Sequence, residues 1–171
     1  MARYSKRKKL RDWIGNKDNK NFRKRNELLR ELLATEETYV ASLRNFVTNY
    51  AKPAKQNTQL LSERKSKVIF SNIEQILGIN ETVLAGIQAA MTKWPSKNEL
   101  GETFNRMAPF FKAYVTYINN YDAAFELLER CEKKKSKFYQ FMCDTSSKNP
   151  TDHGLRSLLI MPVQRIPRYK M

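Results

Sequence analysis

Apolar positions recur every three or four residues along most of the chain, starting near Glu27. Two neighbouring lines of such positions run side by side through the first long segment. The first line comprises Leu28, Leu32, Thr35, Tyr39, Ser42, Phe46 and Tyr50, and the second comprises Leu29, Leu33, Glu36, Val40, Leu43 and Val47. This spacing is typical of an amphipathic helix with a wide buried face. We expect the helix to end near Pro53, which cannot continue the hydrogen-bond ladder.

Four later segments repeat the pattern. They are a segment over 60–91 with an interruption at Gly78, an aromatic stripe over 101–121, a helix over 122–142 and a last apolar segment over 154–171. Three consecutive lysines at 133–135 indicate a solvated helix face or a bend. The polar stretch 144–152 is expected to be a loop.

No segment alternates apolar and polar residues with the two-residue period of a strand, and only five glycines and six prolines are available for turns. A sandwich or barrel of short strands needs more turn residues than this. The sequence therefore predicts an all-α fold, an elongated bundle of long helices.

The net charge of +15 over 171 residues is unevenly distributed. Residues 1–25 carry a net charge of +9, and residues 26–171 carry +6. We therefore expect a basic leader over 1–25, flexible or conditionally helical, followed by one domain. The leader has four possible roles: a solvated tail, a contact with an anionic membrane surface, a calmodulin-type target, or an autoinhibitory arm. Its candidate membrane contacts are Lys6, Arg7, Lys8, Lys9 and Arg11.

Several kinds of chemistry have no residues to support them. No glycine-rich phosphate loop is present, and Cys131, Cys143 and His153 cannot build a zinc site or a cysteine–histidine pair by spacing. We therefore expect no cofactor, no metal and no covalent catalysis. Aromatic residues lie on the apolar lines and not among the basic residues, which disfavours nucleic acid as a partner. The two cysteines fit a reduced, cytoplasmic location.

Three blocks of the sequence resemble the Dbl homology domain of guanine nucleotide exchange factors for Rho-family GTPases. They are ELLATEETYVASL at 31–43, GETFNRMAPFFKAYVTYINNYDAAFELL at 101–128 and LRSLLIMPVQRIPRYKM at 155–171, which contains the pattern PxQRxxRY. The blocks occur in the family's order and at its distances, and the match covers about 26–171. The resemblance implies that the last segment is a helix that continues through Pro162 and Pro167 with a bend.

The resemblance also implies a function and a surface for it. The partner is a Rho-family small GTPase of the Rho, Rac or Cdc42 type, and exchange proceeds without covalent chemistry. By position, Glu36 corresponds to the family's acidic contact with switch I of the GTPase, and Gln164 and Arg168 to positions that face switch II. Arg165 is a further candidate contact, with support inside the domain as its alternative.

The chain departs from the family pattern at its end. Met171 lies inside the third block, where the family's domain continues with a further long helix and usually a pleckstrin homology domain. The sequence therefore predicts a domain without its final helix, with self-association through the apolar surface left exposed. A non-catalytic helical interaction domain, docked on a membrane by its basic leader, is the alternative function.

Overall fold

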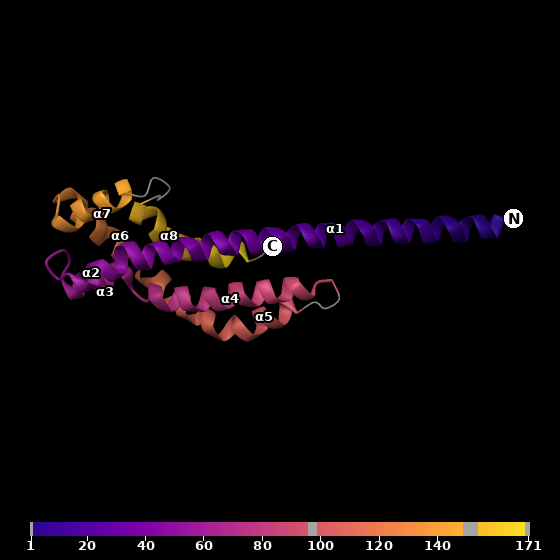
Figure 1. Ribbon diagram of the computed structural model, residues 1–171, viewed down its shortest axis with the longest axis horizontal. Helices are drawn as coiled ribbons and strands as arrows, with labels where there is room; N and C mark the ends of the chain where they lie inside the picture. The colour runs from indigo at the N-terminus through magenta and orange to yellow at the C-terminus, as the bar shows by residue number, and fades with distance from the viewer. Residues whose placement is uncertain (1, 96–98, 149–153, 170–171) are drawn as a thin grey trace. The chain divides into compact units, whose positions relative to one another are not determined.

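All the described regular structure in this chain is helical. The computed structural model describes residues 2–95, 99–148 and 154–169, with side chains from residue 19 onward. No strand occurs within these ranges, so the predicted all-α class is confirmed (Figure 1). The chain forms two compact units, Met1–Glu36 and Glu37–Met171.

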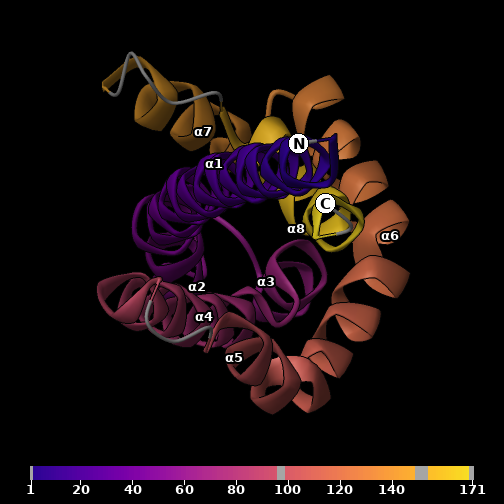
Figure 2. The ribbon, with the colours of Figure 1, turned by 90° about the vertical axis from the view of Figure 1, so that its right-hand side faces the viewer.

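The helices follow one another with short connections. They are α1 (Ala2–Asn45), the π-helical turn η1 (Phe46–Ala51), α2 (Lys52–Gln56), α3 (Glu63–Phe70), α4 (Ile73–Lys93), α5 (Leu100–Met107), the 3₁₀ turn η2 (Ala108–Lys112), α6 (Ala113–Lys133), α7 (Lys137–Lys148) and α8 (Gly154–Arg168). Helices α4, α5 and α6 follow one another around the second unit (Figure 2).

The first unit consists of the greater part of α1. Its backbone is helical from Ala2, well before the start expected at Glu27. The apolar spacing marks only the part of a helix that is buried, whereas lysine and arginine are good helix formers and extend one without apolar contacts. Leu29 and Leu32 are buried, but Leu28, expected on the buried face, is 40% exposed. The predicted boundary between leader and domain at residue 25 stays a prediction.

The first helical stretch of the second unit does not stop at Pro53 as expected. α1 passes into the π-helical turn η1, where the Lys52 N–H donates to the Val47 carbonyl five residues earlier. Pro53 then lies in the first turn of α2, a position where a missing N–H is tolerated. The helical path therefore ends three residues later than predicted, at Gln56.

The interruption expected at Gly78 lies at Ser71 instead. Gly78 is an exposed residue within the continuous helix α4, whereas Ser71 takes φ 45° between α3 and α4. Asn72 holds this turn, because its side-chain Nδ2 donates to the Ala113 carbonyl of α6 at 2.9 Å. The lysine run at 133–135 does contain a bend, with Lys135 at φ 45° between α6 and α7. The stretch expected to be a loop from residue 144 is helical as far as Lys148.

Aromatic side chains make the centre of the core of the second unit. Phe70 lies against Phe46 and Phe138, with ring centroids 5.9 Å and 6.2 Å away, and Phe138 stacks on Phe141 at 6.0 Å. Aliphatic residues of α3, α4, α6 and α8 surround these rings. The core therefore joins the start of the second unit to α8, the last described helix.

Two glycines of α4 have opposite surroundings, which gives a test of this packing. At Gly86 an added Cβ would overlap Thr103 Cγ2 of α5, and Thr103 is buried with its Oγ1 bonded to the Glu99 carbonyl at 3.3 Å. At Gly78 an added Cβ would meet nothing within 4 Å. Helix α5 therefore approaches the backbone of α4 closely at Gly86 and not at Gly78.

We expect Gly86→Ala to lower the free energy of unfolding by about 1–3 kcal/mol, because the methyl group overpacks the contact between α4 and α5. Gly78→Ala should raise it by roughly 0.5–1 kcal/mol, because alanine loses less backbone entropy in a helix. Urea unfolding followed by circular dichroism measures both. Equal effects of the two substitutions would contradict the close approach at Gly86.

Candidate functional site

Helix α8 presents two different faces. Leu155, Leu158, Leu159, Pro162 and Arg165 are buried, at the three- and four-residue spacing of one helix face. Gln164, Pro167 and Arg168 are exposed on the other side of the last turns. The helix therefore has an apolar face that fixes it to the bundle and a polar face that is open to a partner.

Pro162 and Pro167 both lie inside α8, so the helix expected to run through them is confirmed. A proline within a helix removes one N–H donor and crowds the carbonyl four residues earlier, at about 3 kcal/mol. The hydroxyl of Tyr117 on α6 donates to the Leu159 carbonyl, three residues before Pro162, at 3.0 Å. Pro162 leaves the Leu158 carbonyl without its helical donor, and the Tyr117 bond ties the adjacent carbonyl of the same turn to α6.

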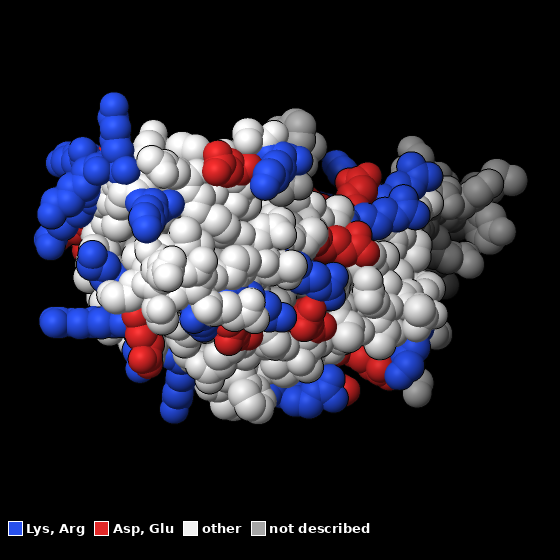
Figure 3. Space-filling view, turned by 60° about the vertical axis from the view of Figure 1, so that its left-hand side comes forward, with Lys and Arg blue, Asp and Glu red and all other residues white. Residues whose placement is uncertain are grey.

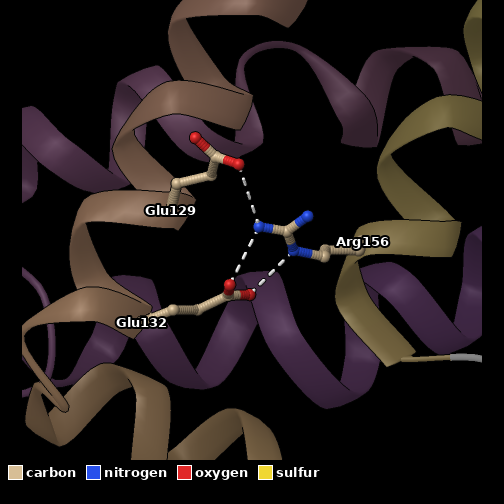
Figure 4. Close-up of polar contacts among 3 residues, drawn as sticks. All are labelled: Glu129, Glu132 and Arg156. Atoms are coloured by element: carbon tan, nitrogen blue, oxygen red, sulfur yellow. Dashed lines mark hydrogen bonds and ion pairs between the residues drawn. The ribbon is translucent and has the colours of Figure 1, made fainter.

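An arginine near the start of α8 ties it to the end of α6. Arg156 Nε and Nη2 donate to the two carboxylate oxygens of Glu132 at 2.9 and 2.8 Å, and Nη2 lies 3.4 Å from Glu129 Oε1 (Figure 4). The guanidinium carbon is 4.7 Å from the centroid of the Phe125 ring. The hydrogen bond to Glu132 raises the pKa of Arg156. This bidentate geometry fixes direction as well as distance.

A second arginine ties the other end of α8. Arg165 is only 3% exposed, and its guanidinium carbon lies 5.2 Å from the Tyr39 ring centroid and 4.6 Å from that of Tyr169. Tyr39 belongs to the segment of α1 inside the second unit, and Tyr169 follows Arg165 by four residues. Cation–π contacts are strongest for a desolvated cation, and arginine makes them more often than lysine. Arg165 therefore attaches the last turns of α8 to α1.

A buried asparagine on α4 links the two tyrosines that flank Arg165. The Tyr169 hydroxyl donates to Asn80 Oδ1 at 3.2 Å, and Asn80 Nδ2 donates to the Tyr114 hydroxyl at 2.7 Å. The Tyr114 hydroxyl lies 3.1 Å from that of Tyr39. Asn80 Nδ2 also donates to the Ile76 carbonyl at 2.7 Å. The chain of hydrogen bonds therefore runs from the end of α8 through α4 and α6 to α1.

The candidate contacts predicted from the sequence fall in different surroundings. Gln164 and Arg168 are both exposed, one helical turn apart, with Arg168 Nη2 3.4 Å from Gln164 Oε1. Arg165 is buried, which favours its alternative role as a support inside the domain. Glu36, in the first unit, is also fully buried, so its carboxylate is not open to a partner in this structure. The side chains of Lys6, Arg7, Lys8, Lys9 and Arg11, and His153 entirely, lie outside the described residues.

The pattern of the sequence did not reveal the residues that hold this site in place. Asn80 lies within the apolar pattern of α4, and a single polar residue there does not predict a hydrogen-bond network. Tyr114 belongs to the aromatic stripe that predicts core packing, and Tyr169 is the last residue of the PxQRxxRY pattern. The one local signal is the four-residue spacing of Arg165 and Tyr169, which puts both side chains on the same face of a helix.

Within the described ranges, no three histidine, cysteine or acidic side chains gather closely enough to hold a metal ion. None of the helices there combines the length and the apolar character needed to cross a bilayer.

Comparison with known families decides what the described helices belong to. The model of the RhoGEF domain matches residues 28–171 of this chain. The chain belongs to the RhoGEF domain family. The predicted resemblance is therefore confirmed, and the chain carries a guanine nucleotide exchange factor domain of the Rho/Rac type.

Curated relatives support this membership. The Guanine exchange factor for Rac 30 of Dictyostelium discoideum is 35% identical over 147 residues, which are 85% of this chain and 9% of the relative. The Rac guanine nucleotide exchange factor JJ of the same organism is 33% identical over 96% of this chain and 15% of the relative. Human Rho guanine nucleotide exchange factor 10 is 28% identical over 85% of this chain and 11% of the relative. This RhoGEF chain therefore spans a small part of the length of these relatives.

Solved structures show the same fold. One structure of the Vav1 exchange factor matches with a TM-score of 0.75 and 25% identity, over 82% of this chain and 38% of that chain. An autoinhibited Dbl homology domain solved by NMR matches with a TM-score of 0.70 and 25% identity, over 82% of this chain and 66% of that chain. The helices of this RhoGEF chain are therefore arranged as in a Dbl homology domain.

The two arginines near the end of α8 predict different costs of substitution. Arg165→Lys should lower the free energy of unfolding by about 2–4 kcal/mol, because a compact ammonium group cannot replace the planar guanidinium between the two rings. Arg168→Lys, three residues away and exposed, should change it by less than about 0.5 kcal/mol. Urea unfolding compares them, and equal costs would contradict the supporting role of Arg165.

The hydroxyl of Tyr117 predicts a dependence of stability on alkaline pH. Burial raises the pKa of Tyr117 above its ordinary value of 10.0. The folded chain therefore keeps a proton that the unfolded chain loses above about pH 10, and stability falls there by up to about 1.4 kcal/mol per pH unit. Tyr117→Phe should lower the free energy of unfolding by about 1 kcal/mol at pH 7. Between pH 10 and 11 the free energy of unfolding of this variant should fall less than that of the unsubstituted chain. Parallel pH curves for the two proteins would contradict the assignment.

Proposed function

We propose that this chain accelerates the release of GDP from a Rho- or Rac-type GTPase through the exposed face of α8. The observation that carries the proposal is the division of α8 into a buried, doubly anchored face and an exposed face bearing Gln164 and Arg168. Gln164 offers an amide and Arg168 a long cation. These groups suit backbone carbonyls and acidic side chains of a partner's switch region.

The mechanism requires no covalent step by this chain. The GTPase itself holds GDP and Mg²⁺, and the exchange factor binds more tightly to a conformation of the GTPase that holds them poorly. By linkage, the factor weakens nucleotide binding by the same free energy by which loss of the nucleotide strengthens binding of the factor. A rigidly held surface favours this, because a surface that yielded would not discriminate between two conformations of the partner.

The anchors of α8 give this surface its rigidity. Arg156 fixes the start of the helix to α6, and Arg165 and Tyr169 fix its end to α1 and α4. We assign Arg165 as a positioning residue that acts through Gln164 and Arg168, and not as a contact of its own. Its cation–π contacts with Tyr39 and Tyr169 support this assignment, because they hold the guanidinium inside the domain.

Glu36 stays in the proposal as the acidic contact with switch I. Its full burial means that the carboxylate must become exposed when the GTPase binds. Loss of stability together with full exchange activity in Glu36→Gln would instead assign the carboxylate to the fold.

The test is stimulated release of a fluorescent GDP analogue from a panel of Rho-, Rac- and Cdc42-type GTPases. Arg168→Glu should lower the stimulated rate on the order of a hundredfold, because a reversed charge at a contact repels the acidic surface that selected the cation. Arg106→Glu, which reverses an exposed cation on α5, is the matched control and should keep the rate. Circular dichroism verifies that both variants keep their helix content.

Two results would contradict the proposal. One is full exchange activity in a folded Arg168→Glu variant. The other is an unaltered rate of GDP release with every GTPase of the panel, which favours the alternative of a non-catalytic helical interaction domain. We also propose that the basic leader contacts anionic membranes, a proposal that rests on the charge of residues 1–25 alone. The predicted self-association and cytoplasmic location stay predictions.

A further inference from the structure

The positive charge of the second unit is concentrated in two short segments. Residues 52–67 hold five basic residues against Glu63, a net charge of +4, and residues 132–137 hold four lysines against Glu132, a net charge of +3. The second unit, residues 37–171, has a net charge of +8, so the remainder of the unit carries only +1. The two segments therefore account for nearly all of its excess positive charge.

The two segments lie at the same end of the second unit. Figure 1 draws the turn between α6 and α7 and the loop between α2 and α3 at its left-hand end, and Lys and Arg side chains gather at the left of Figure 3. We call this surface the basic end. It comprises Lys52, Lys55, Arg64, Lys65, Lys67, Lys133, Lys134, Lys135 and Lys137, all of them exposed.

Ion pairs neutralise little of the basic end. Lys67 pairs with Glu63 at 2.7 Å and Lys55 with Glu74 at 2.9 Å, while the carboxylate of Glu132 is taken by Arg156. The seven remaining cations have no acidic group within ion-pair distance among the described residues; they are Lys52, Arg64, Lys65, Lys133, Lys134, Lys135 and Lys137. Their mutual repulsion is unfavourable for the isolated domain.

One lysine of the basic end also occupies a strained backbone position. The Ser136 N–H donates to the Cys131 carbonyl at 3.0 Å and the Lys135 N–H to the Glu132 carbonyl at 2.9 Å, which is a Schellman motif with Lys135 at the left-handed position, φ 45°. Glycine or asparagine fits this position best, because a larger side chain is crowded there. The turn itself therefore gives no reason for a lysine at residue 135.

We propose that the basic end docks on an anionic lipid bilayer. Eight of its nine cations are lysines, compact point charges on flexible stems that suit a diffuse layer of lipid charge. Neither segment contains an aromatic residue that could stack on bases. A bilayer therefore fits this surface better than a nucleic acid.

Docking through the basic end leaves the proposed exchange surface open. Helix α8 runs away from the turn between α6 and α7, and its last turn, with Gln164 and Arg168, lies farther along the second unit (Figure 1). The docking proposal is therefore independent of the proposed exchange activity, and each can fail without the other.

The test measures sedimentation of the full chain with phosphatidylcholine vesicles, with and without about 30% phosphatidylserine. Lys6, Arg7, Lys8, Lys9 and Arg11 are changed to Gln in every protein, so that this part of the leader does not mask the basic end. The variant adds Lys134→Gln, Lys135→Asn and Lys137→Gln, where asparagine is tolerated at the left-handed position. The matched control adds Arg106→Gln, Lys112→Gln and Lys148→Gln, which remove three exposed cations elsewhere.

We expect the variant to lose about a hundredfold in partition to phosphatidylserine vesicles, since each lysine near an anionic surface contributes roughly fivefold. The control should lose less than about threefold, because its cations lie outside the two segments that form the basic end. GDP release from a GTPase in solution, without vesicles, should be the same for both. This last measurement separates a failure of docking from a failure of exchange.

Three outcomes would overturn the proposal. The first is an equal loss in variant and control, which would mean that only net charge matters. The second is no binding to phosphatidylserine vesicles by the chain with the neutralised leader. The third concerns a single-stranded RNA added as a competitor. If it displaced the chain from the vesicles at a phosphate concentration far below that of the anionic lipid, and bound the variant poorly, the basic end would be assigned to nucleic acid.

Discussion

The arrangement of the second unit depends on how the buried guanidinium of Arg165 is accommodated. An ionised group taken out of water is costly unless its surroundings compensate it, and here two aromatic rings lie within reach of it. One ring comes from α1 and the other from the end of α8. Their hydroxyls are joined by Asn80 and Tyr114, so α4 and α6 take part as well. Four helices therefore have to meet in one register for a single cation to be buried.

This constraint explains how α8 keeps its shape with two prolines inside it. The prolines remove two of the N–H groups that would otherwise hold the helix together. The Arg156 cluster at one end, the Tyr117 bond near the middle and Arg165 at the other end replace that support from outside the helix. Because neighbouring helices hold α8, their contacts determine which way its exposed face points. The positions of Gln164 and Arg168 are thus a property of the whole second unit.

The sequence predicted what depends on short-range spacing and missed what depends on distant partners. Periodicity found the helices, and the PxQRxxRY pattern found α8 and its exposed residues. The break at Ser71 has no local signal, because serine is neither a usual left-handed residue nor a helix breaker; the bond from Asn72 to Ala113, 41 residues away, holds that turn. Asn80 likewise gains its meaning only from Tyr169, 89 residues later. Side-chain partners at such separations cannot be read from one sequence.

The distribution of charge in space, like these contacts, cannot be read from the sequence, because the net charge of the chain does not say where the charges lie in the fold. A net charge of +6 over residues 26–171 describes a mildly basic domain, yet the fold brings +7 of charge to one end and leaves the remainder near neutrality. A surface potential decays within about 8 Å at physiological salt, so only charges brought close to a bilayer contribute to binding it. Each electrostatic contact of this kind is weak and reversible by itself. Under the two membrane proposals, the leader and the basic end would raise each other's effective concentration once either is engaged, and membrane affinity would depend on both.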